Sequence, residues 1–265
     1  MMLYNEKKFI KEFFLFSYKQ ACASIFGASL LFVIIVTKWI DFSNIFLTRY
    51  DVIFICAILI QTFLILTKSE TWQEVKVIAT FHILATCMEL FKTSPQIKSW
   101  EYPDDVGFFM IATVPLFTGF LYSSVGSYIA RAWRIFHLSF THFPPLTYVS
   151  LLASAIYINF FTHHFIIDIR LILFIVTFIL FWKTTVYFTM IKTPRSMPLL
   201  LGFALIAFFL YIAENIGSYM KVWLYPNQQV TWHIVPIGKY GAWFLLIIVS
   251  FALIAVIYRK KIYKK

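Results

Sequence analysis

Charged residues are scarce in this chain, and their scarcity excludes a soluble globular protein. Only 13% of the 265 residues are Asp, Glu, Lys or Arg, whereas soluble domains carry about 25%. Hydrophobic residues make up 61% of the sequence, and the mean hydropathy is +0.79. These values are typical of a membrane protein.

Cysteine, glycine and proline are also few, and each low count excludes a class of protein. The three cysteines, Cys22, Cys56 and Cys87, follow no metal-ligand spacing, so neither a zinc module nor a disulfide scaffold is expected. With 8 Gly and 9 Pro and no Ser/Gly-rich segment, the chain lacks a flexible linker between domains. We expect one integral membrane domain over residues 1–265.

Apolar segments that approach the length of a membrane span recur along the sequence. A span needs about 20 mostly apolar residues. The pattern predicts an all-α polytopic transmembrane bundle of about eight spans, with seven as the alternative because the third and fifth segments are short or polar at one end. The predicted spans are residues 18–37, 51–67, 75–92, 107–130, 146–162, 167–187, 197–218 and 238–258.

The distribution of charge predicts the orientation. With eight spans, the termini and the connections on their side carry a net charge of +12, and the other side carries −1, which together give the formal +11. The positive-inside rule then predicts a multi-pass protein of the cell (inner) membrane with both termini in the cytoplasm. Arg131 and Arg134 are predicted to be cytoplasmic anchors. We expect membrane lipids as partners and no nucleic acid.

One pattern of residues occurs twice. Residues 89–115 contain Glu89, then Trp-Glu-Tyr-Pro from Trp100, then a Val-Pro pair, and residues 214–236 contain Glu214, Trp-Leu-Tyr-Pro from Trp223, and a second Val-Pro. Matching positions lie 121 to 125 residues apart. This predicts two direct four-helix repeats, about residues 18–134 and 143–258, with a site between them. The aromatic residues are predicted either to anchor at the membrane interface or to line that site.

Glu89 and Glu214 are the leading candidates for chemistry. The predicted topology places both near the outer boundary, at the ends of parallel spans. Two facing carboxylates in a partly desolvated cleft favour acid/base work, because one pKa rises and that group donates a proton while the other remains an anion. The structural alternative is that each carboxylate caps a helix end or pairs with Lys92 or Lys221.

A second polar group is predicted on the same side. The run from Asn159 to His164 is followed by Asp168, and His164 and Asp168 are four residues apart, on one helical face. His163, His164 and Asp168 would suit a divalent metal such as zinc or iron, acid/base chemistry without a metal, or simply a polar turn at the interface. The full set of candidate catalytic residues is His82, Glu89, His163, His164, Asp168, Glu214 and Asn215.

Several strings in the sequence resemble a known family. The stretch from Val114 to Arg134, the run from Asn159 to His164, and Ala213-Glu214-Asn215-Ile216-Gly217 are similar to the YoaT-like family of uncharacterised bacterial integral membrane proteins. The similarity covers nearly the whole chain. It implies a bacterial inner-membrane protein and carries no assigned activity.

A weaker resemblance links the chain to membrane-embedded carotenoid cyclases and hydratases. Their repeats also carry a helix-end Glu followed by an aromatic-rich loop and a Pro, and His82, Glu89 and Val114-Pro115-Leu116 follow the order of the hydratase pattern. The cyclases' Pro-x-Glu signature is absent, because Pro115 and Pro236 are followed by other residues. What the resemblance implies is a carboxylic acid that protonates an alkene while a second carboxylate stabilises the cation.

Three functions compete at this stage. The leading hypothesis is a membrane-embedded enzyme acting on a lipid or isoprenoid-like substrate near the outer side, by carboxylate chemistry with or without a metal. The first alternative is a proton- or cation-coupled transporter that uses the same carboxylates between the repeats. The second alternative is a non-catalytic membrane scaffold. Whether the chain is an enzyme, and its oligomeric state, are left open by the sequence.

Overall fold

The computed structural model describes residues 2–191 and 194–259, and for residues 2–9 the backbone alone. In this part of the chain most residues are helical. The helices are α1 (Met2–Ala23), α2 (Ile25–Thr37), α3 (Arg49–Leu66), α4 (Trp72–Lys92), α5 (Phe117–Ile135), α6 (Leu146–Thr162), α7 (Arg170–Phe181), α8 (Leu199–Tyr219), the 3-10 turn η1 (Pro226–Gln228) and α9 (Gly238–Ile257). The prediction of a mostly helical protein is confirmed.

Local sequence signals explain where two of these helices begin. The side chain of Thr48 accepts a hydrogen bond from the Asp51 backbone, and the Asp51 carboxylate accepts one from the Thr48 backbone, which starts α3. Thr71 and Glu74 form the same reciprocal pair at the start of α4. Such capping boxes satisfy backbone N–H groups that a helix start leaves unpaired.

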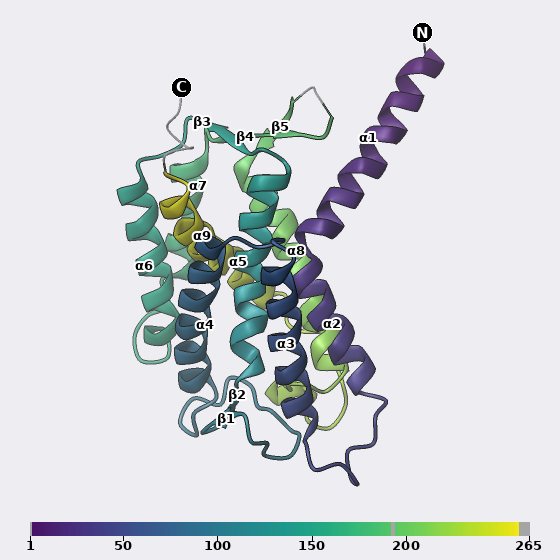
Figure 1. Cartoon of the computed structure of the whole chain (residues 1–265). Coiled ribbons are helices and arrows are strands. Elements are labelled where there is room, and N and C mark those ends of the chain that lie inside the picture. The colour runs from purple at the N-terminus through teal and green to yellow at the C-terminus, as the bar shows by residue number, and fades with distance from the viewer. Residues whose placement is uncertain (1, 192–193, 260–265) are drawn as a thin grey trace.

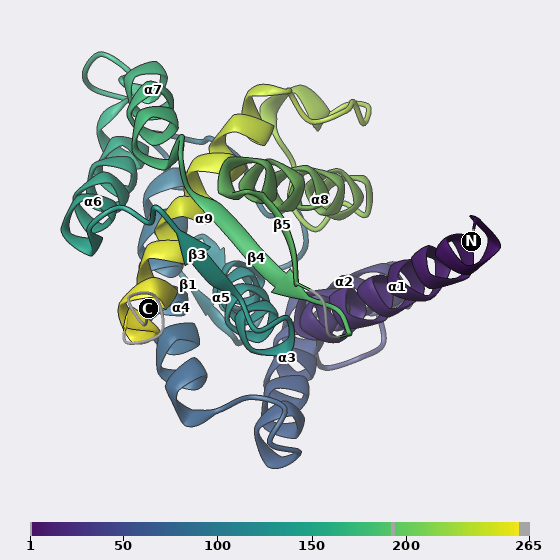
Figure 2. The same cartoon turned by 90° about the horizontal axis from the view of Figure 1, so that it is seen from above.

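Helices α5 and α9 lie at the centre of the bundle (Figures 1 and 2). Helix α5 packs against α1, α2, α3, α4 and α9, and α9 packs also against α4, α6 and α8. Trp133 of α5 stacks on Phe251 of α9 with ring centroids 5.7 Å apart, at the centre of the largest apolar core. Helices α1 and α2 form one bent pair, with an angle of 71° at the break.

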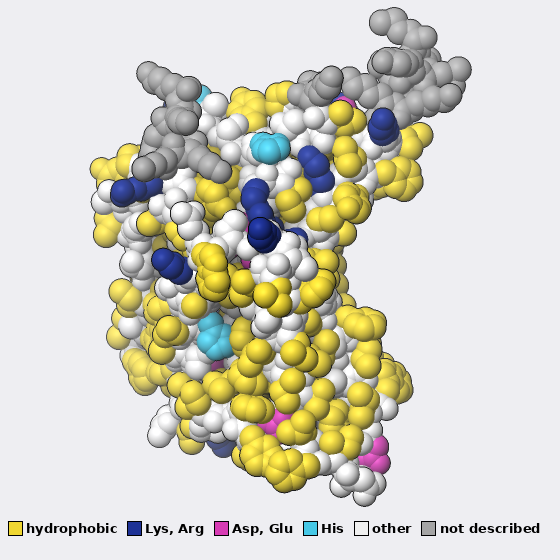
Figure 3. Space-filling view, viewed as in Figure 1, with side chains coloured by type: hydrophobic (Ala, Val, Ile, Leu, Met, Phe, Trp, Pro, Cys, Tyr) yellow, Lys and Arg dark blue, Asp and Glu magenta, His cyan; other side chains and the backbone are white. Residues whose placement is uncertain are grey.

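The face of the bundle seen in Figure 3 is apolar over most of its height. Phe63, Leu171 and Phe209 are each more than 60% exposed, which in water would be an unusually large apolar surface. Helices α3, α8 and α9 are long and apolar enough to cross a membrane, and the bent pair of α1 and α2 would make a fourth crossing. Helices α6 and α7 are apolar but shorter, so the count of eight spans stays a prediction.

Two small sheets modify the predicted all-α bundle. Strands β1 (Met110–Ile111) and β2 (Val114–Pro115) pair antiparallel, and β3 (Ser139–Thr141), β4 (Thr185–Thr189) and β5 (Pro194–Pro198) form a three-stranded antiparallel sheet. The expected span over 167–187 therefore ends as a helix at Phe181, and the one expected over 107–130 begins at Phe117. Thr185–Thr189 consists entirely of β-branched and aromatic residues, which favours a strand.

The three-stranded sheet lies at the same end of the bundle as both chain ends (Figure 1). Arg195 of β5 forms an ion pair with Glu12 of α1 at 2.7 Å, and Lys19 of α1 donates to the carbonyl of Thr189 in β4 at 2.9 Å. We call this the terminal end. The opposite end carries the connections that follow α4 and α8, where Glu89 and Glu214 lie.

Candidate functional site

Glu89 lies in the last turn of α4 and is 1% exposed. Three neutral groups donate to its carboxylate: the Trp100 indole at 2.9 Å, the Tyr102 hydroxyl at 2.6 Å and the Tyr122 hydroxyl at 2.7 Å. Trp100 and Tyr102 come from the connection after α4, and Tyr122 comes from α5. The carboxylate is thus held by aromatic donors and not by a cation.

Glu214 lies near the end of α8 and is 6% exposed. The Trp223 indole donates to it at 3.1 Å, the Tyr225 hydroxyl also donates to it, and the Trp243 indole donates at 3.1 Å. Trp223 and Tyr225 follow α8 in the chain, and Trp243 belongs to α9. The environment of Glu214 therefore matches that of Glu89 donor by donor, with an indole in place of one phenol.

The repeated Trp-x-Tyr pattern now has a physical explanation, because the Trp and the Tyr of each copy bind the Glu of that copy. The middle residues of the two copies also pair: Glu101 and Leu224 exchange two backbone hydrogen bonds of 2.9 Å each. The third donors meet as well, since the rings of Tyr122 and Trp243 stack with centroids 5.7 Å apart. A continuous set of contacts joins the two carboxylates.

One cation lies beside the carboxylate pair. The ammonium of Lys239 is 4.3 Å from the ring centroid of Tyr225 and 4.5 Å from that of Trp100. It interacts electrostatically with both Glu214 and Glu89, and the two carboxylates interact with each other. Cations over aromatic faces are stabilised by the ring quadrupole. The rings that donate to the carboxylates thus also hold a compensating charge.

Both carboxylates line one cavity of about 690 Å³. The cavity extends between α1, α2, α5, α8 and α9 toward the three-stranded sheet, and its wall is mostly apolar, with Phe16, Leu31 and Ile206 as examples. Trp100, Tyr102, Trp223 and Tyr225 line the carboxylate end, so they face a site and do not act as exposed interface anchors. Its volume and lining suit a long apolar molecule with one reactive position.

His82 and Asn215 lie near the carboxylates in sequence but do not contact them. His82, on α4, packs against Phe120 with ring centroids 4.7 Å apart, and its Nδ1 has no hydrogen-bond partner among the described residues. Asn215 accepts from the Val235 backbone at 2.9 Å and donates to the Tyr211 carbonyl at 2.8 Å. Asn215 therefore fixes the segment before α9, and His82 is not among the residues that line the cavity.

His163 and His164 lie together but apart from the cavity. Their ring centroids are 4.1 Å apart, and the Lys92 ammonium lies 3.3 Å from His163 Nε2 and 2.7 Å from His164 Nε2. Burial and the Lys92 charge lower the pKa of His164 to about 4, and burial also lowers the pKa of His163. Asp168 pairs with Arg170 at 2.5 Å, and this contact lowers the pKa of Asp168 to about 2.

This arrangement does not favour the metal site considered from the sequence. Asp168 faces Arg170 and Asn159, and the imidazole nitrogens face a lysine. Over residues 2–191 and 194–259, no three His, Cys, Asp or Glu side chains are placed to share a metal ion. A divalent cation would also have to displace the Lys92 ammonium.

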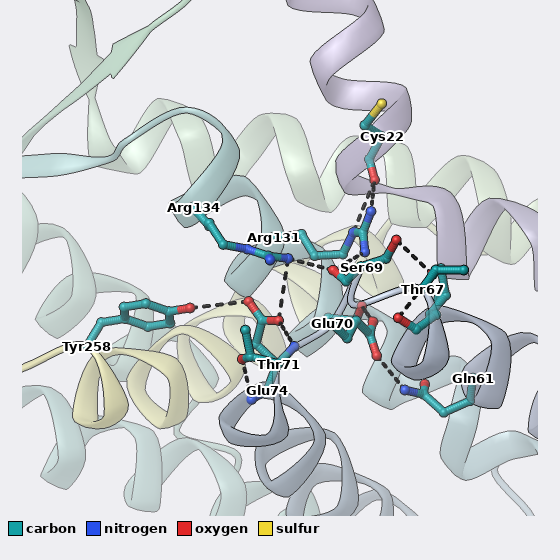
Figure 4. Close-up of polar contacts among 12 residues, drawn as sticks. Cys22, Gln61, Thr67, Ser69, Glu70, Thr71, Glu74, Arg131, Arg134 and Tyr258 are labelled. Atoms are coloured by element: carbon teal, nitrogen blue, oxygen red, sulfur yellow. Dashed lines mark hydrogen bonds and ion pairs between the residues drawn. The ribbon is translucent and has the colours of Figure 1, made fainter.

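A buried polar cluster at the start of α4 was not anticipated from the sequence (Figure 4). Glu70 and Glu74 are 4% and 1% exposed. Arg131 donates to the Ser69 carbonyl at 2.7 Å and to the Cys22 carbonyl at 2.8 Å, so it joins α5 to two other segments and is not a free cytoplasmic anchor. The Thr-x-x-Glu spacing of the capping box was the available signal for Glu74.

Arg134 and Tyr258 complete this cluster around Glu74. Arg134 donates to the Ser69 carbonyl at 2.6 Å and lies 3.5 Å from the Glu74 carboxylate, which also accepts from Tyr258 at 3.2 Å. Glu70 accepts from Gln61 and Ser127. The cluster does not line the cavity.

Comparisons with known proteins identify the family. Residues 12–251 match the family described as "Protein of unknown function (DUF817)". The chain is 42% identical over 246 residues to "Uncharacterized protein YoaT" of Bacillus subtilis (strain 168), covering 93% of this chain and 91% of that protein. No solved structure matches. The chain belongs to the DUF817 family, which confirms the resemblance drawn from its sequence.

Proposed function

We propose that the protein is a membrane-embedded enzyme that takes a lipid or isoprenoid-like substrate into the apolar cavity and acts on it with Glu89 and Glu214. The observation that carries this proposal is the shared cavity of about 690 Å³, with an apolar wall and two buried carboxylates at one end. Buried carboxylates are costly unless they are paired or functional. Neither of these two forms an ion pair within the described part of the chain.

The membrane arrangement that accompanies this function has eight spans in two direct repeats, with both termini in the cytoplasm. The matched donors around Glu89 and Glu214 support the repeats. The start of α1 and the end of α9 lie at the same end of the bundle, which supports an even number of spans (Figure 1). Lys and Arg side chains gather toward that end in the view of Figure 3, in keeping with the positive-inside rule.

The chemistry we propose is acid/base catalysis at a carbon–carbon double bond. A protonated carboxyl group gives its proton to one alkene carbon, and the π electrons form the new C–H bond. The cation on the neighbouring carbon is stabilised by the aromatic rings and by the second, ionised carboxylate. That carboxylate then removes a proton from an adjacent carbon, whose C–H electrons form the new double bond. The product is an isomer, and no oxidant or reductant is needed.

The aromatic donors prepare the carboxylates for this role. Three hydrogen bonds fix the orientation of each carboxylate before substrate arrives, so no reorganisation is required during the reaction. Tyr122 and Trp243 link the two groups through their stacked rings. Glu214, with 6% exposure against 1% for Glu89, is the more accessible of the two and is assigned to the first proton transfer.

The proposal is tested by deuterium incorporation. The full-length protein in nanodiscs is incubated in D₂O with a mixture of isoprenoid alkenes, and mass spectrometry detects the alkenes that gain one mass unit. Replacing Glu214 by Gln is expected to lower the incorporation rate at least 100-fold, the usual range for loss of a catalytic acid or base being about 10²–10⁴-fold. Glu101→Gln, which changes an exposed carboxylate in the connection after α4, is the matched control.

The same variants distinguish enzyme from transporter. If wild-type protein incorporates no deuterium into any alkene, but proteoliposomes show proton-coupled uptake that Glu214→Gln abolishes, the carboxylates serve transport. If Glu89→Gln and Glu214→Gln change neither activity, the carboxylates are structural and the protein is a scaffold. The mostly apolar wall of the cavity argues against a continuous path for ions.

A further inference from the structure

Lys92 is a buried cation without an acidic partner. It closes α4, is 5% exposed, and its ammonium contacts His163 and His164, at 3.3 and 2.7 Å. No carboxylate lies within ion-pair distance of it among the described residues. A buried ammonium without a counter-ion is strongly unfavourable. The function proposed for Glu89 and Glu214 does not account for this position.

The two histidines present lone pairs to this cation. His163 Nδ1 lies 2.7 Å from the Asn159 carbonyl, which requires a proton on Nδ1 and leaves Nε2 to accept from Lys92. The His164 ring packs against Phe91 with centroids 5.8 Å apart. Two of the three ammonium protons of Lys92 are thereby used. One donor is left over, together with the uncompensated charge.

Further cations surround the same point. Arg170 and Lys239 both interact electrostatically with Lys92 and with His164. Asp168 is the acidic group that interacts with Lys92, and it is already bound to Arg170 at 2.5 Å. Lys239 also lies beside Glu214 and Glu89, so it is compensated there. Lys92 and Arg170 against the single carboxylate of Asp168 leave a positive site that an anion would complete. Lys and Arg together with imidazole are a common set of ligands for phosphate.

The segment beside this cation cluster is apolar and exposed. Phe165, Ile166 and Ile167 follow His164 directly and are 72%, 64% and 85% exposed. They lie in the connection between α6 and α7, in the half of the bundle away from the chain ends (Figure 1). Apolar side chains next to cations are the pattern of a segment that enters a membrane surface. The phosphate that suits this position is that of a lipid.

We propose that Lys92, His164 and Arg170 bind the phosphate group of an anionic lipid at the membrane surface, with His163 holding the Lys92 ammonium in place. The phosphate oxygens accept the remaining proton of Lys92 and hydrogen bonds from Arg170, while the exposed run from Phe165 to Ile167 contacts the acyl chains. The site is separate from the cavity and does not depend on the carboxylate chemistry proposed above.

Native mass spectrometry of the detergent-purified, full-length protein tests this site. The protein is mixed with equal amounts of phosphatidylglycerol and phosphatidylcholine that share the same acyl chains. Wild-type protein is expected to bind phosphatidylglycerol at least about 10-fold more strongly, which corresponds to about 1.4 kcal/mol. Lys92→Met is expected to abolish most of this preference. Lys98→Met, an exposed lysine six residues further along, is the matched control and is expected to leave the preference unchanged.

A second variant guards against misfolding of the first. His164→Gln keeps the buried lysine, occupies an exposed position, and is expected to reduce the preference by a smaller factor. Equal binding of the two lipids by wild-type protein, or an unchanged preference in both variants, would overturn the proposal. Binding of inorganic phosphate with no preference between the lipids would also overturn it, because the site would then serve a free anion.

Discussion

Glu89 and Glu214 accept hydrogen bonds from neutral indole and phenol groups at one end of the bundle, and they line a cavity. Glu70 and Glu74 are as deeply buried at the start of α4, but Arg134, a helix cap and amide or hydroxyl donors hold them, and they do not line the cavity. Both pairs satisfy their hydrogen bonds. The difference is that the second pair only joins segments of the fold, whereas the first pair also lines an apolar cavity.

The comparison predicts opposite consequences for equivalent substitutions. Glu214→Gln is expected to lower deuterium incorporation at least 100-fold, while unfolding free energy changes by no more than about 1–2 kcal/mol, because a neutral amide is easier to bury than a carboxylate. Glu74→Gln is expected to leave the activity within about 3-fold, since a group outside the cavity contributes no proton. Activity per folded molecule and unfolding midpoints, measured side by side, check both expectations.

The two pairs would be equivalent, and the comparison would fail, if Glu74→Gln lowered activity as much as Glu214→Gln does. Gel filtration of each variant excludes loss of folded protein as the reason.

Replacing Arg131, in the cluster around Glu70 and Glu74, should give the largest loss of stability. Arg131→Met leaves the Cys22 carbonyl without its side-chain donor and removes one of the two arginine donors to the Ser69 carbonyl. We expect about 3 kcal/mol of lost unfolding free energy, since an unsatisfied buried carbonyl costs about 1–3 kcal/mol and a hydrogen bond to a charged group contributes about 1.5–3 kcal/mol. Arg134→Met is the matched control, with a side chain 37% exposed, and should lose less than half as much. Denaturant titration in detergent gives both values. Equal losses would show that Arg131 is an ordinary surface anchor.

The sequence predicted the helical membrane class and the family, because both depend on composition and on local strings. It singled out Glu89 and Glu214 through the repeated Trp-x-Tyr pattern, and the same repetition contained the third donors: Tyr122 and Trp243 are 121 residues apart, as are the two Val-Pro pairs. That signal was available and unused. The eight spans and the repeats stay predictions, because α6 and α7 are short and α4 carries four charged residues.

Other features could not be read from the chain because they depend on long-range packing. The strand over Thr185–Thr189 pairs with residues 139–141, more than 40 positions earlier, so an apolar segment that reads as the end of a span becomes a strand. Arg131 looks like a positive-inside anchor in the sequence, and only the approach of Ser69 and Cys22 shows it to be buried. His163 and His164 suggested a metal until Lys92, 71 residues before His163, was placed beside them.

Each pair of buried glutamates has a member that accepts a hydrogen bond from a tyrosine that can be replaced by phenylalanine. Tyr102→Phe removes a donor 2.6 Å from Glu89, and Tyr258→Phe removes one 3.2 Å from Glu74. Hydrogen bonds to charged groups contribute about 1.5–3 kcal/mol, so Tyr102→Phe should lose an amount in that range and Tyr258→Phe, with its longer contact, less than about 1 kcal/mol. Deuterium incorporation should fall only with Tyr102→Phe. If Tyr258→Phe lost more unfolding free energy than Tyr102→Phe, the hydrogen bond to Glu74 would be the stronger one, and this expectation would be wrong.

Acid should loosen the end that carries the histidines before it affects the start of α4. The pKa of His164 is about 4 in the folded protein, against about 6.5 in an unfolded chain. Between these values the unfolded state binds a proton that the folded state does not, so the contribution of His164 to stability is complete above about pH 6.5 and declines as the pH falls toward 4. Asp168, with a folded pKa of about 2, loses its contribution only below its unfolded value of about 3.9.

Hydrogen exchange measured between pH 7 and 4 separates these two contributions. Lys92, His163, Arg170 and Lys239 interact electrostatically with His164, and Asp168 interacts with His163 and Lys92. Once exchange is corrected for its intrinsic pH dependence, residues 163–170 should lose protection before residues 67–74. His164→Gln should remove the His164 part of the decline between pH 6.5 and 4, which leaves the smaller part due to His163, and should keep the decline below pH 4. If instead both segments lose protection together in the wild type and the variant, repulsion around Lys92 does not limit stability, and the two ends of the bundle respond to acid as one unit.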